Sequence, residues 1–556
     1  MKLTHFAAIG LQLWITVAHE SHSYEWKHRC PQLGPLNPKS SKALADMDQY
    51  LNSEEFLNIS VARLSGAVQI DTTSQNSWRD FPGEDPVWKP MSTFRKYLEE
   101  TFPLIHRHLK LERINKHGLV YTWEGRNQSL KPTLFLAHQD VVPAPNETIR
   151  GEWTRGPFSG DSDGKYIWGR GSIDCKTTLI ASMSAVESLL EVRYAPQRTL
   201  ILAFGFDEEI GGFQGARRIA EHLLNRYKKD GIALLIDEGP GFFHDKEFAT
   251  IYAVPGLAEK GAFNANISVH MESGHIAFST RDNSITIMAD LITKLHAEHP
   301  MSGPIQKYDP FLETLFCLGQ HVAGFREKYI DALERIDLNE TAVNDFLPRI
   351  IDERPALRPL VESTHSLAMI QGGNKINVIP EQTVLSINHR LHLGTSVEQA
   401  KSHLEQIVKA YIAGKNADKD GTNLTFRGWA DEDSVNSIKL TAFQGSLEQS
   451  PVTPFSVSGI TPYGILQGTI QSLYKDSNLT LVTPIVMPAN TDSRHYWNLT
   501  QHIFRFSPGH DMADAQDNQI SSNAHNNNER ASIIGHVNGV KWYSLFIRNM
   551  DETDLA

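Results

Sequence analysis

The sequence predicts an α/β fold, in which a doubly wound, mostly parallel sheet carries an inserted, smaller α+β domain. Three short, almost wholly apolar runs, at residues 132–137, 199–206 and 232–236, predict strands that are buried on both faces. Residues 177–192 carry apolar side chains at helical spacing, and residues 215–227 are also typical of a helix. Because strands that alternate with helices pack into a sheet covered on both faces, this order predicts the doubly wound arrangement.

The pattern changes after about residue 260, which predicts a second domain inserted into the first. Its expected elements are a strand at 262–270, a helix near 284–298, a strand at 382–391 and an amphipathic helix at 397–412. Residues 305–360 are charged and predict no element. The strand–helix pattern returns from about residue 425. We therefore divide the chain into a main domain at 19–260 and 419–556 and an inserted domain at 261–418.

The composition is that of an ordinary globular protein, and it excludes some classes of partner. With 53 basic and 65 acidic residues the net charge is −12, so the basic footprint of a nucleic-acid-binding protein is absent. The three cysteines, Cys30, Cys175 and Cys317, cannot build a disulfide framework, although one bridge such as Cys30–Cys317 can form. No zinc-finger spacing occurs, so a metal site must use histidines and carboxylates.

The N-terminus is typical of a secretory signal peptide, which we place at residues 1–18. Lys2 precedes an apolar run at residues 6–18 that is too short to span a bilayer comfortably and ends in small residues. A short buried helix is the alternative. Sequons for N-glycosylation begin at Asn58, Asn127, Asn146, Asn266, Asn339, Asn423, Asn478 and Asn498. We therefore expect a glycoprotein of the secretory pathway, secreted or vacuolar, with no stable membrane anchor after signal cleavage.

Polar clusters follow each of the three apolar strands at the carboxyl end. The clusters are 138–140, 207–209 and 237–238, and a fourth, at 169–174, precedes the helix at 177–192. Ligands of open α/β sheets bind beyond the carboxyl ends of the strands. So many carboxylates are unfavourable together without cations, and histidine with carboxylates is a suitable ligand set for zinc. The sequence therefore predicts two divalent metals, about 3.5–4 Å apart as in hydrolytic enzymes.

These clusters resemble the motifs of the dinuclear-zinc peptidases, which include aminoacylases, bacterial acetylornithine and succinyl-diaminopimelate deacylases, and carboxypeptidase S. The matching motifs are HxDVVP at 138–143, WGRGSxDxK at 168–176 and DEExGG at 207–212, in that order. Residues 64–70 and the run NTDSR at 490–494 are most similar to the carboxypeptidase S branch, the fungal Gly-Xaa carboxypeptidases. The resemblance covers most of the chain and implies a catalytic domain with an inserted lid.

The resemblance also implies a ligand set for two zinc ions per chain. Its members are His138 and Asp237 on the first metal, Glu209 and His525 on the second, and Asp174 between the two. Asp140 would orient His138 and fix its tautomer. His510 and His536 compete with His525 for its place. Cys175 follows the bridging aspartate, where it is either a ligand or a small buried side chain.

The remaining roles follow from the same resemblance. Glu208 matches the general base, which accepts a proton from water and passes it to the leaving amine. His275 matches the lid histidine that stabilises the developing oxyanion. Asn377, Arg390 and Arg494 match substrate contacts, and a guanidinium can hold a free carboxylate in a bidentate manner.

We expect a di-zinc metallo-exopeptidase that hydrolyses the C-terminal peptide bond of short, Gly-Xaa-type peptides. An N-acyl-amino-acid hydrolase is the alternative within the same chemistry, because both enzymes cut an amide next to a free carboxylate. A catalytically inactive binding protein on a peptidase scaffold is the alternative from another class. The expected partner is a short peptide or an N-acyl-amino acid and not a nucleic acid. Monomer and homodimer both stay open, since in dimeric relatives the lid histidine serves the neighbouring subunit's site.

Overall fold

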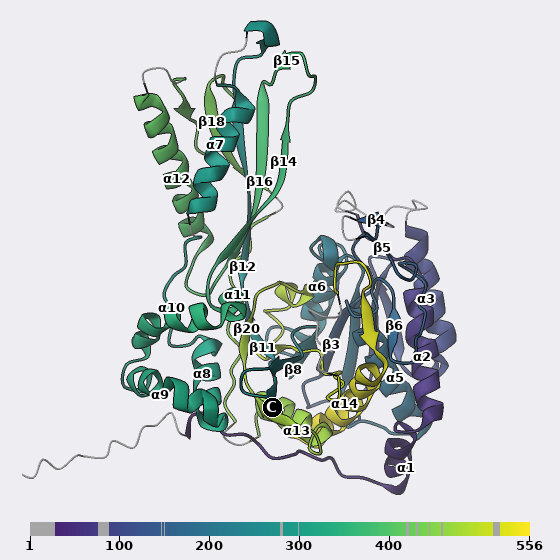
Figure 1. Ribbon diagram of the computed structural model, residues 1–556. Helices are drawn as coiled ribbons and strands as arrows, with labels where there is room; N and C mark the ends of the chain where they lie inside the picture. Colours follow the sequence, from purple (N-terminus) through teal and green to yellow (C-terminus); the bar gives the residue numbers. More distant parts are fainter. Residues whose placement is uncertain are drawn as a thin grey trace, which may run out of the picture.

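The computed structural model describes residues 28–75, 88–145, 147–148, 151–278, 282–298, 300–418, 422–429, 432–443, 445–457, 460–514 and 523–555. The expected signal peptide and Asn146, the glycosylation acceptor of one sequon, lie outside these residues. Figure 1 shows a compact main domain from which an elongated lid, the inserted domain, rises. Helices that are long and apolar enough to span a membrane are absent from the described residues.

An eight-stranded sheet forms the centre of the main domain, in the order β1-β2-β7-β3-β8-β21-β11-β20. Its strands are β1 Lys110–Ile114, β2 Gly118–Trp123, β3 Thr133–His138, β7 Leu200–Gly205, β8 Leu234–Asp237, β11 Gly256–Glu259, β20 Ile485–Met487 and β21 Ile503–Arg505. The central strands β7, β3, β8 and β21 run parallel to one another. The three strands predicted from apolar runs are therefore confirmed, and they are neighbours in the sheet.

Helices cover both faces of this sheet, which confirms the doubly wound arrangement. The helices of the main domain are α1 Lys42–Tyr50, α2 Glu54–Val68, α3 Lys89–Thr101, α4 Pro103–His108, α5 Lys176–Glu191, α6 Ala216–Tyr227, α13 Pro462–Leu473 and α14 Ile533–Asp551. Alternate residues of β3 serve the two faces, because successive side chains of a strand point to opposite sides. Phe135 packs with α5 and α14, whereas Leu134 packs with α6.

Short strands complete the main domain. They are β4 Glu147–Thr148, β5 Gly151–Glu152, β6 Tyr166–Trp168 with β22 Arg530–Ser532, and the sheet of β9 Phe242–Asp245, β10 Thr250–Ala253 and β19 Leu479–Val482. The pairing of β22 with β6 is antiparallel and joins the segment after residue 523 to the loop that precedes α5. Residues distant in sequence thus meet above the carboxyl ends of the central strands.

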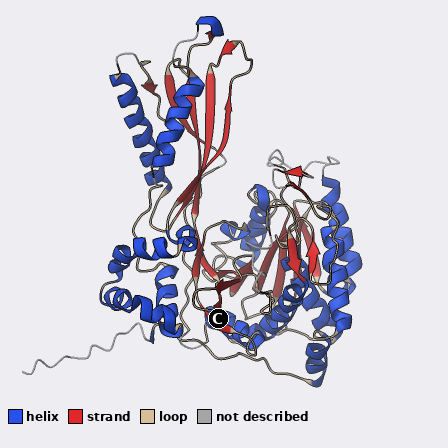
Figure 2. Cartoon of the chain, viewed as in Figure 1, coloured by secondary structure: helices blue, strands red, loops and turns tan. Residues whose placement is uncertain are grey.

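The lid is a five-stranded sheet with two helices on one face, as Figure 2 shows in red and blue. Its strands are β12 Gly261–His270, β14 Thr364–Gly372, β16 Gln382–Leu391, β17 Thr425–Phe426 and β18 Ser437–Ala442, and its helices are α7 Ser284–Ala297 and α12 Val397–Ala417. A two-stranded ribbon, β13 Gly274–His275 with β15 Val378–Ile379, forms the tip. Because β17 and β18 belong to this sheet, the lid continues past residue 418, where the sequence pattern placed the return to the main domain.

Residues 305–360, for which the sequence predicted no element, are helical. The helices are α8 Pro310–His321, α9 Ala323–Leu338, α10 Val343–Glu353 and α11 Arg358–Val361. α8 buries nearly every side chain, so it lacks the one-sided apolar periodicity that identifies a surface helix. This block packs against Tyr252, Leu481 and Ile485 and not within the lid sheet.

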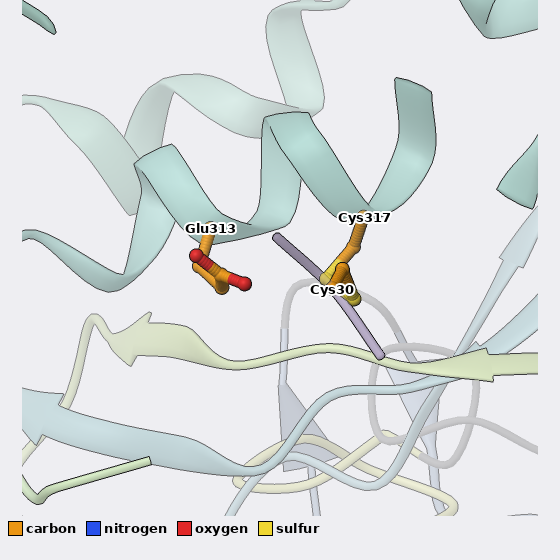
Figure 3. A group of neighbouring side chains, drawn as sticks. All are labelled: Cys30, Glu313 and Cys317. Carbon is orange, nitrogen blue, oxygen red and sulfur yellow. A yellow bond between two sulfur atoms is a disulfide. The ribbon is translucent and has the colours of Figure 1, made fainter. Parts of the chain in front are cut away.

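A disulfide between Cys30 and Cys317 ties the N-terminal segment to α8. Figure 3 shows the bridge beneath α8, with Glu313 on the same helix. Gln32 also joins the N-terminal segment to β19, because its carboxamide donates one hydrogen bond to the backbone of Val482 and accepts another from it. The bridge that the sequence only permitted is therefore present, and Cys175 is a free, buried thiol.

Candidate active site

The polar clusters at the strand ends converge on one group of side chains. His138 is the last residue of β3, and Glu209 lies in the turn that follows β7. Asp174 lies two residues before the start of α5. His138 Nε2 lies 3.1 Å from Asp174 Oδ1, and His525 Nε2 lies 3.0 Å from Asp174 Oδ2 and 3.2 Å from Glu209 Oε1. Asp174 therefore faces a different histidine with each carboxylate oxygen, which is the geometry expected of a bridging ligand.

Asp140 holds the backbone of the loop that carries Glu208 and Glu209 in place. It is wholly buried, and its carboxylate oxygens accept the backbone N–H groups of Glu208 and Glu209 at 3.1 and 3.2 Å. His138 Nδ1 lies 2.9 Å from the Asp140 backbone oxygen and 3.5 Å from Oδ1. These contacts hold the Nε2 edge of His138 toward Asp174 and support the orienting role predicted for Asp140.

Glu238, and not Asp237, reaches the group from the end of β8. Glu238 Oε1 lies 3.5 Å from His138 Nε2. The Asp237 carboxylate instead accepts the backbone N–H groups of Glu238 and Ser493, both at 2.9 Å. Neighbouring residues at a strand end point to opposite sides, so only one of the two acids can face His138. Of the two acids at this strand end, Glu238 is the one whose carboxylate lies close to His138, so we propose it as an alternative to Asp237 for this ligand place.

Arg390 and Arg494 come together beside Glu208, although they belong to different domains. Arg494 Nη2 lies 3.2 Å from Glu208 Oε1. Arg390 is the penultimate residue of β16, at the root of the lid. Burial and then the nearby charge of Arg494 lower the pKa of Arg390. The main domain and the lid therefore each supply one guanidinium group, and that of Arg494 contacts Glu208 directly.

His275 and Asn377 are brought to each other and not to this cluster. Ile276 N donates to Asn377 O at 3.4 Å, and His275 pairs with Val378 between β13 and β15. Both side chains are exposed. Figure 1 places β15 at the end of the lid that is farthest from β3 and β8. Within one chain, the predicted oxyanion residue lies far from the predicted metal ligands.

The two histidines that competed with His525 are occupied elsewhere. His510 Nε2 lies 2.8 Å from His244 Nε2, and His536 Nδ1 lies 2.9 Å from Thr177 Oγ1. Cys175 Sγ accepts the backbone N–H of His138 at 3.2 Å. Its sulfur also lies within 4.8 Å of the ligand atoms of His138 and Glu238. Cys175 is therefore a small buried side chain that lies next to the candidate metal ligands.

Comparison with known proteins agrees with this geometry. Residues 134–549 match the sequence model of the family described as "Peptidase family M20/M25/M40". The chain belongs to this peptidase family. Carboxypeptidase S of Saccharomyces cerevisiae is 35% identical over 544 residues, which cover 94% of this chain and 89% of that protein. The N-fatty-acyl-amino acid synthase/hydrolase PM20D1 of Mus musculus is 30% identical over 93% of each chain.

Solved structures of this M20/M25/M40 family share the fold. The dipeptidase Dug1p of Saccharomyces cerevisiae has a TM-score of 0.61 at 14% identity, covering 92% of this chain and 98% of that chain. Human carnosine dipeptidase 1 has a TM-score of 0.59 at 14% identity, covering 93% and 100%. Both the predicted α/β class and the lid arrangement are thereby confirmed. The match to the peptidase family and the 35% identity to carboxypeptidase S show that the chain is a metal-dependent exopeptidase.

The donor set of this M20 peptidase fits a pair of divalent cations. His138, Asp174 and Glu209 place ligand atoms within 4.8 Å of one another. Burial raises the pKa of Glu238 to about 7 and that of Glu208 well above its usual value, so the ionised cluster is unfavourable without cations. Hydrogen bonds to Asp174 and Glu209 raise the pKa of His525 to about 11, which indicates a strong anionic field at the same place.

Glu529 is a residue of this site that the sequence analysis missed. It is wholly buried, and Oε1 accepts the backbone N–H groups of Ile173 and Asp174 at 3.1 and 3.3 Å. Its other oxygen pairs with Arg170. Glu529 therefore fixes the loop that carries Asp174. It lies in a polar run that predicts only a surface loop, so no local pattern distinguished it.

The choice between Asp237 and Glu238 as the proposed metal ligand is testable with two matched variants. Glu238→Gln and Asp237→Asn each remove one negative charge from adjacent positions. We expect Glu238→Gln to lower the metal content toward about one ion per chain, because it weakens a ligand that faces His138. Asp237→Asn should retain the full content. Metal content after dialysis measures this, and the reverse pattern would return the ligand role to Asp237.

Proposed function

We propose that this enzyme is a zinc carboxypeptidase that hydrolyses the C-terminal peptide bond of short peptides, with the Gly-Xaa type favoured. The observation that carries the proposal is the pair of arginines near Glu208, of which Arg494 lies 3.2 Å from Glu208 Oε1 and Arg390 is close enough for the charge of Arg494 to lower its pKa. Two guanidiniums next to an acid-rich cluster are suited to a substrate's free α-carboxylate. Amino-terminal recognition would instead need an anionic pocket at this distance from the reacting bond.

The residues divide the reaction among them. His138, Asp174, Glu209, Glu238 and His525 would hold two zinc ions, which supply Lewis-acid polarisation of the scissile carbonyl and of water. Glu208 accepts the proton of the attacking water and delivers it to the leaving amine. The contact with Arg494 holds the Glu208 carboxylate between the proposed metal ligands and the arginines proposed to bind the substrate's carboxylate.

A second candidate function is hydrolysis of N-acyl-amino acids. The 30% identity to the N-fatty-acyl-amino acid synthase/hydrolase PM20D1 over 93% of each chain favours it. Such substrates also present a free carboxylate next to the scissile amide, so Arg390 and Arg494 serve both candidates. Turnover of a panel of blocked dipeptides and acyl-amino acids by the purified protein separates them. An inactive binding protein would turn over neither class.

Recognition of the substrate carboxylate predicts a strong preference for free acids over amides. Amidating the C-terminus of a blocked dipeptide should lower kcat/KM by roughly 10- to 150-fold, the equivalent of about 1.5–3 kcal/mol for a charged hydrogen bond. Arg390→Ala or Arg494→Ala should reduce cleavage of the acid far more than cleavage of the amide. Equal cleavage of acid and amide by the wild type would refute carboxylate recognition and indicate a broader amidohydrolase.

We further propose a homodimer in which the lid tip serves the neighbouring subunit's site. The exposed His275 is accompanied by large exposed apolar side chains, such as Phe278 at 83% and Ile376 at 96%. A tip of this kind is typical of a surface that another molecule covers. It would carry His275 to the scissile carbonyl of a second chain as an oxyanion donor.

The shared site is testable by complementation. His275→Ala should lower kcat by about 10²- to 10³-fold, as for loss of an oxyanion donor. Mixing His275→Ala chains with Glu208→Gln chains should restore part of the activity, because one mixed site then contains both intact residues. Subunit exchange is verified with two differently tagged chains. Exchange without rescue would contradict the shared site.

The same proposal places the enzyme in the secretory pathway, as a secreted or vacuolar glycoprotein. The Cys30–Cys317 bridge supports this, since disulfides persist in oxidising compartments. Asn339, one of the sequon residues, is exposed after α9, and its Oδ1 accepts from Thr341 of the same sequon at 2.8 Å.

A further inference from the structure

Asn490 connects the main domain to the lid through both ends of its carboxamide. Its Nδ2 donates to the backbone oxygen of Lys260 at 2.6 Å, where β11 passes into β12. Its Oδ1 accepts from Arg390 Nη1 at 2.5 Å. Lys260 is itself buried, and its backbone N–H donates to Met487 O at 3.1 Å. One side chain therefore fixes the root of the lid and the guanidinium that projects from it.

Arg390 needs such a contact because its surroundings disfavour it. It is half-buried, and its burial together with the nearby charge of Arg494 lowers its pKa more than the charges of Glu208 and Glu259 raise it. Arg494 has a carboxylate partner in Glu208, at 3.2 Å. In the described part of the chain, no carboxylate of an Asp or Glu lies within 4.0 Å of the Arg390 guanidinium, so Arg390 forms no ion pair there. The acceptor that orients Arg390 is thus a neutral amide oxygen.

A neutral acceptor, unlike a carboxylate, leaves the positive charge of Arg390 available to bind a substrate anion. An aspartate at this place would form an ion pair with Arg390 and compete with an incoming anion. An amide oxygen orients one N–H of the guanidinium and leaves its charge and its other donors unneutralised. The bond to Lys260 adds a second constraint, because it sets the lid root and the Arg390 guanidinium in one fixed relation to Arg494.

We propose that Asn490 is a positioning residue that sets specificity for substrates with a free α-carboxylate, acting through Arg390. The inference rests on the proposed function, since it assumes that Arg390 binds the carboxylate. It assigns to Asn490 no contact with the reacting atoms. Its effect should therefore appear in the preference for acid over amide and in KM, with kcat for the acid changed little.

The first test replaces the carboxamide by an apolar group of similar size. Asn490→Leu should lower the acid-to-amide ratio of kcat/KM by about tenfold, mainly through KM, as expected for loss of one charge-assisted hydrogen bond. Asn388→Leu is the matched control. Asn388 lies on the same strand as Arg390, and its Nδ2 donates to Asn264 Oδ1 at 2.7 Å, within the lid sheet. This control should leave the ratio unchanged whatever it does to the melting temperature.

A second variant tests the neutrality of the acceptor and serves if Asn490→Leu does not fold. Asn490→Asp keeps an acceptor for Arg390 but adds a charge. We expect it also to lower the acid-to-amide ratio, by about tenfold or more, because the new carboxylate competes with that of the substrate. A wild-type ratio in Asn490→Asp would overturn the argument from neutrality and with it the proposal.

A double-mutant cycle separates this proposal from the proposed function. In an Arg390→Ala background, Asn490→Leu should change the ratio no further, since residues that act as one unit are non-additive. If Arg390→Ala itself leaves the ratio unchanged, carboxylate recognition by Arg390 fails. If Arg390→Ala lowers the ratio but Asn490→Leu does not, or if the two effects multiply, only the role of Asn490 is overturned.

Discussion

Replacing Glu208 with Gln is expected to lower kcat by about 10²- to 10⁴-fold, the usual contribution of general acid–base catalysis. Glu208 extends toward Arg494 Nη2, at 3.2 Å, whereas His138, Asp174 and Glu209 form the ligand group. A glutamine has almost the same shape and can keep the hydrogen bond to Arg494, but its amide cannot accept a proton from water. The metal content should therefore stay at the wild-type value while turnover falls.

The adjacent residue supplies the control for this result. Glu209→Gln removes the same charge one position along the chain, but Glu209 Oε1 faces His525 at 3.2 Å. This variant should lose metal as well as activity. Metal analysis and steady-state kinetics on both variants distinguish the base from the ligand. Normal turnover by Glu208→Gln would assign the proton transfer to another group.

Asp174→Ala is expected to abolish activity by removing the ligand that both metals share. Its two carboxylate oxygens face His138 and His525 at 3.1 and 3.0 Å, so no other side chain of the group can take its place in both directions. The loss should also raise the concentration of metal needed to stabilise the protein against heat, because metal binding contributes folding free energy. Metal titrations followed by melting temperature measure this effect independently of turnover.

A structural control accompanies this variant. Glu529→Gln leaves all five proposed ligands in place but weakens the contacts that fix the Asp174 loop. It should weaken metal binding less than Asp174→Ala does. An Asp174→Ala protein that binds both metals with wild-type affinity would contradict the bridging role.

The strand ends were predictable from sequence because each is marked by neighbouring residues alone, an apolar run followed by a polar cluster. Apolar runs of strand length followed by His138, Glu209 or Glu238 identify both the buried strands and the edge of the sheet at which ligands gather. The choice between Asp237 and Glu238 was not local. Both follow the same strand, and only the contact of Asp237 with Ser493, from a distant segment, shows which acid turns away from His138.

The part of the chain that sequence reasoning predicts least well is the segment from residue 261 to 442. α8 buries most of its side chains, so its residues lack a one-sided apolar face. Ile438 and Leu440 of β18 alternate with polar residues as in a strand, but only the pairing of β18 with β12 shows that it belongs to the lid. His275 and Asn377 match family positions and do lie together. Their distance from the cluster, however, depends on how the lid is held relative to the main domain, which no local pattern encodes.

The measurement that tests the central claim most directly is the turnover of a blocked dipeptide before and after metal removal. The purified protein should contain about two zinc ions per chain, a dialysed chelator should remove them together with activity, and added zinc should restore both. Full carboxypeptidase activity in a sample shown to be free of metal would contradict the account.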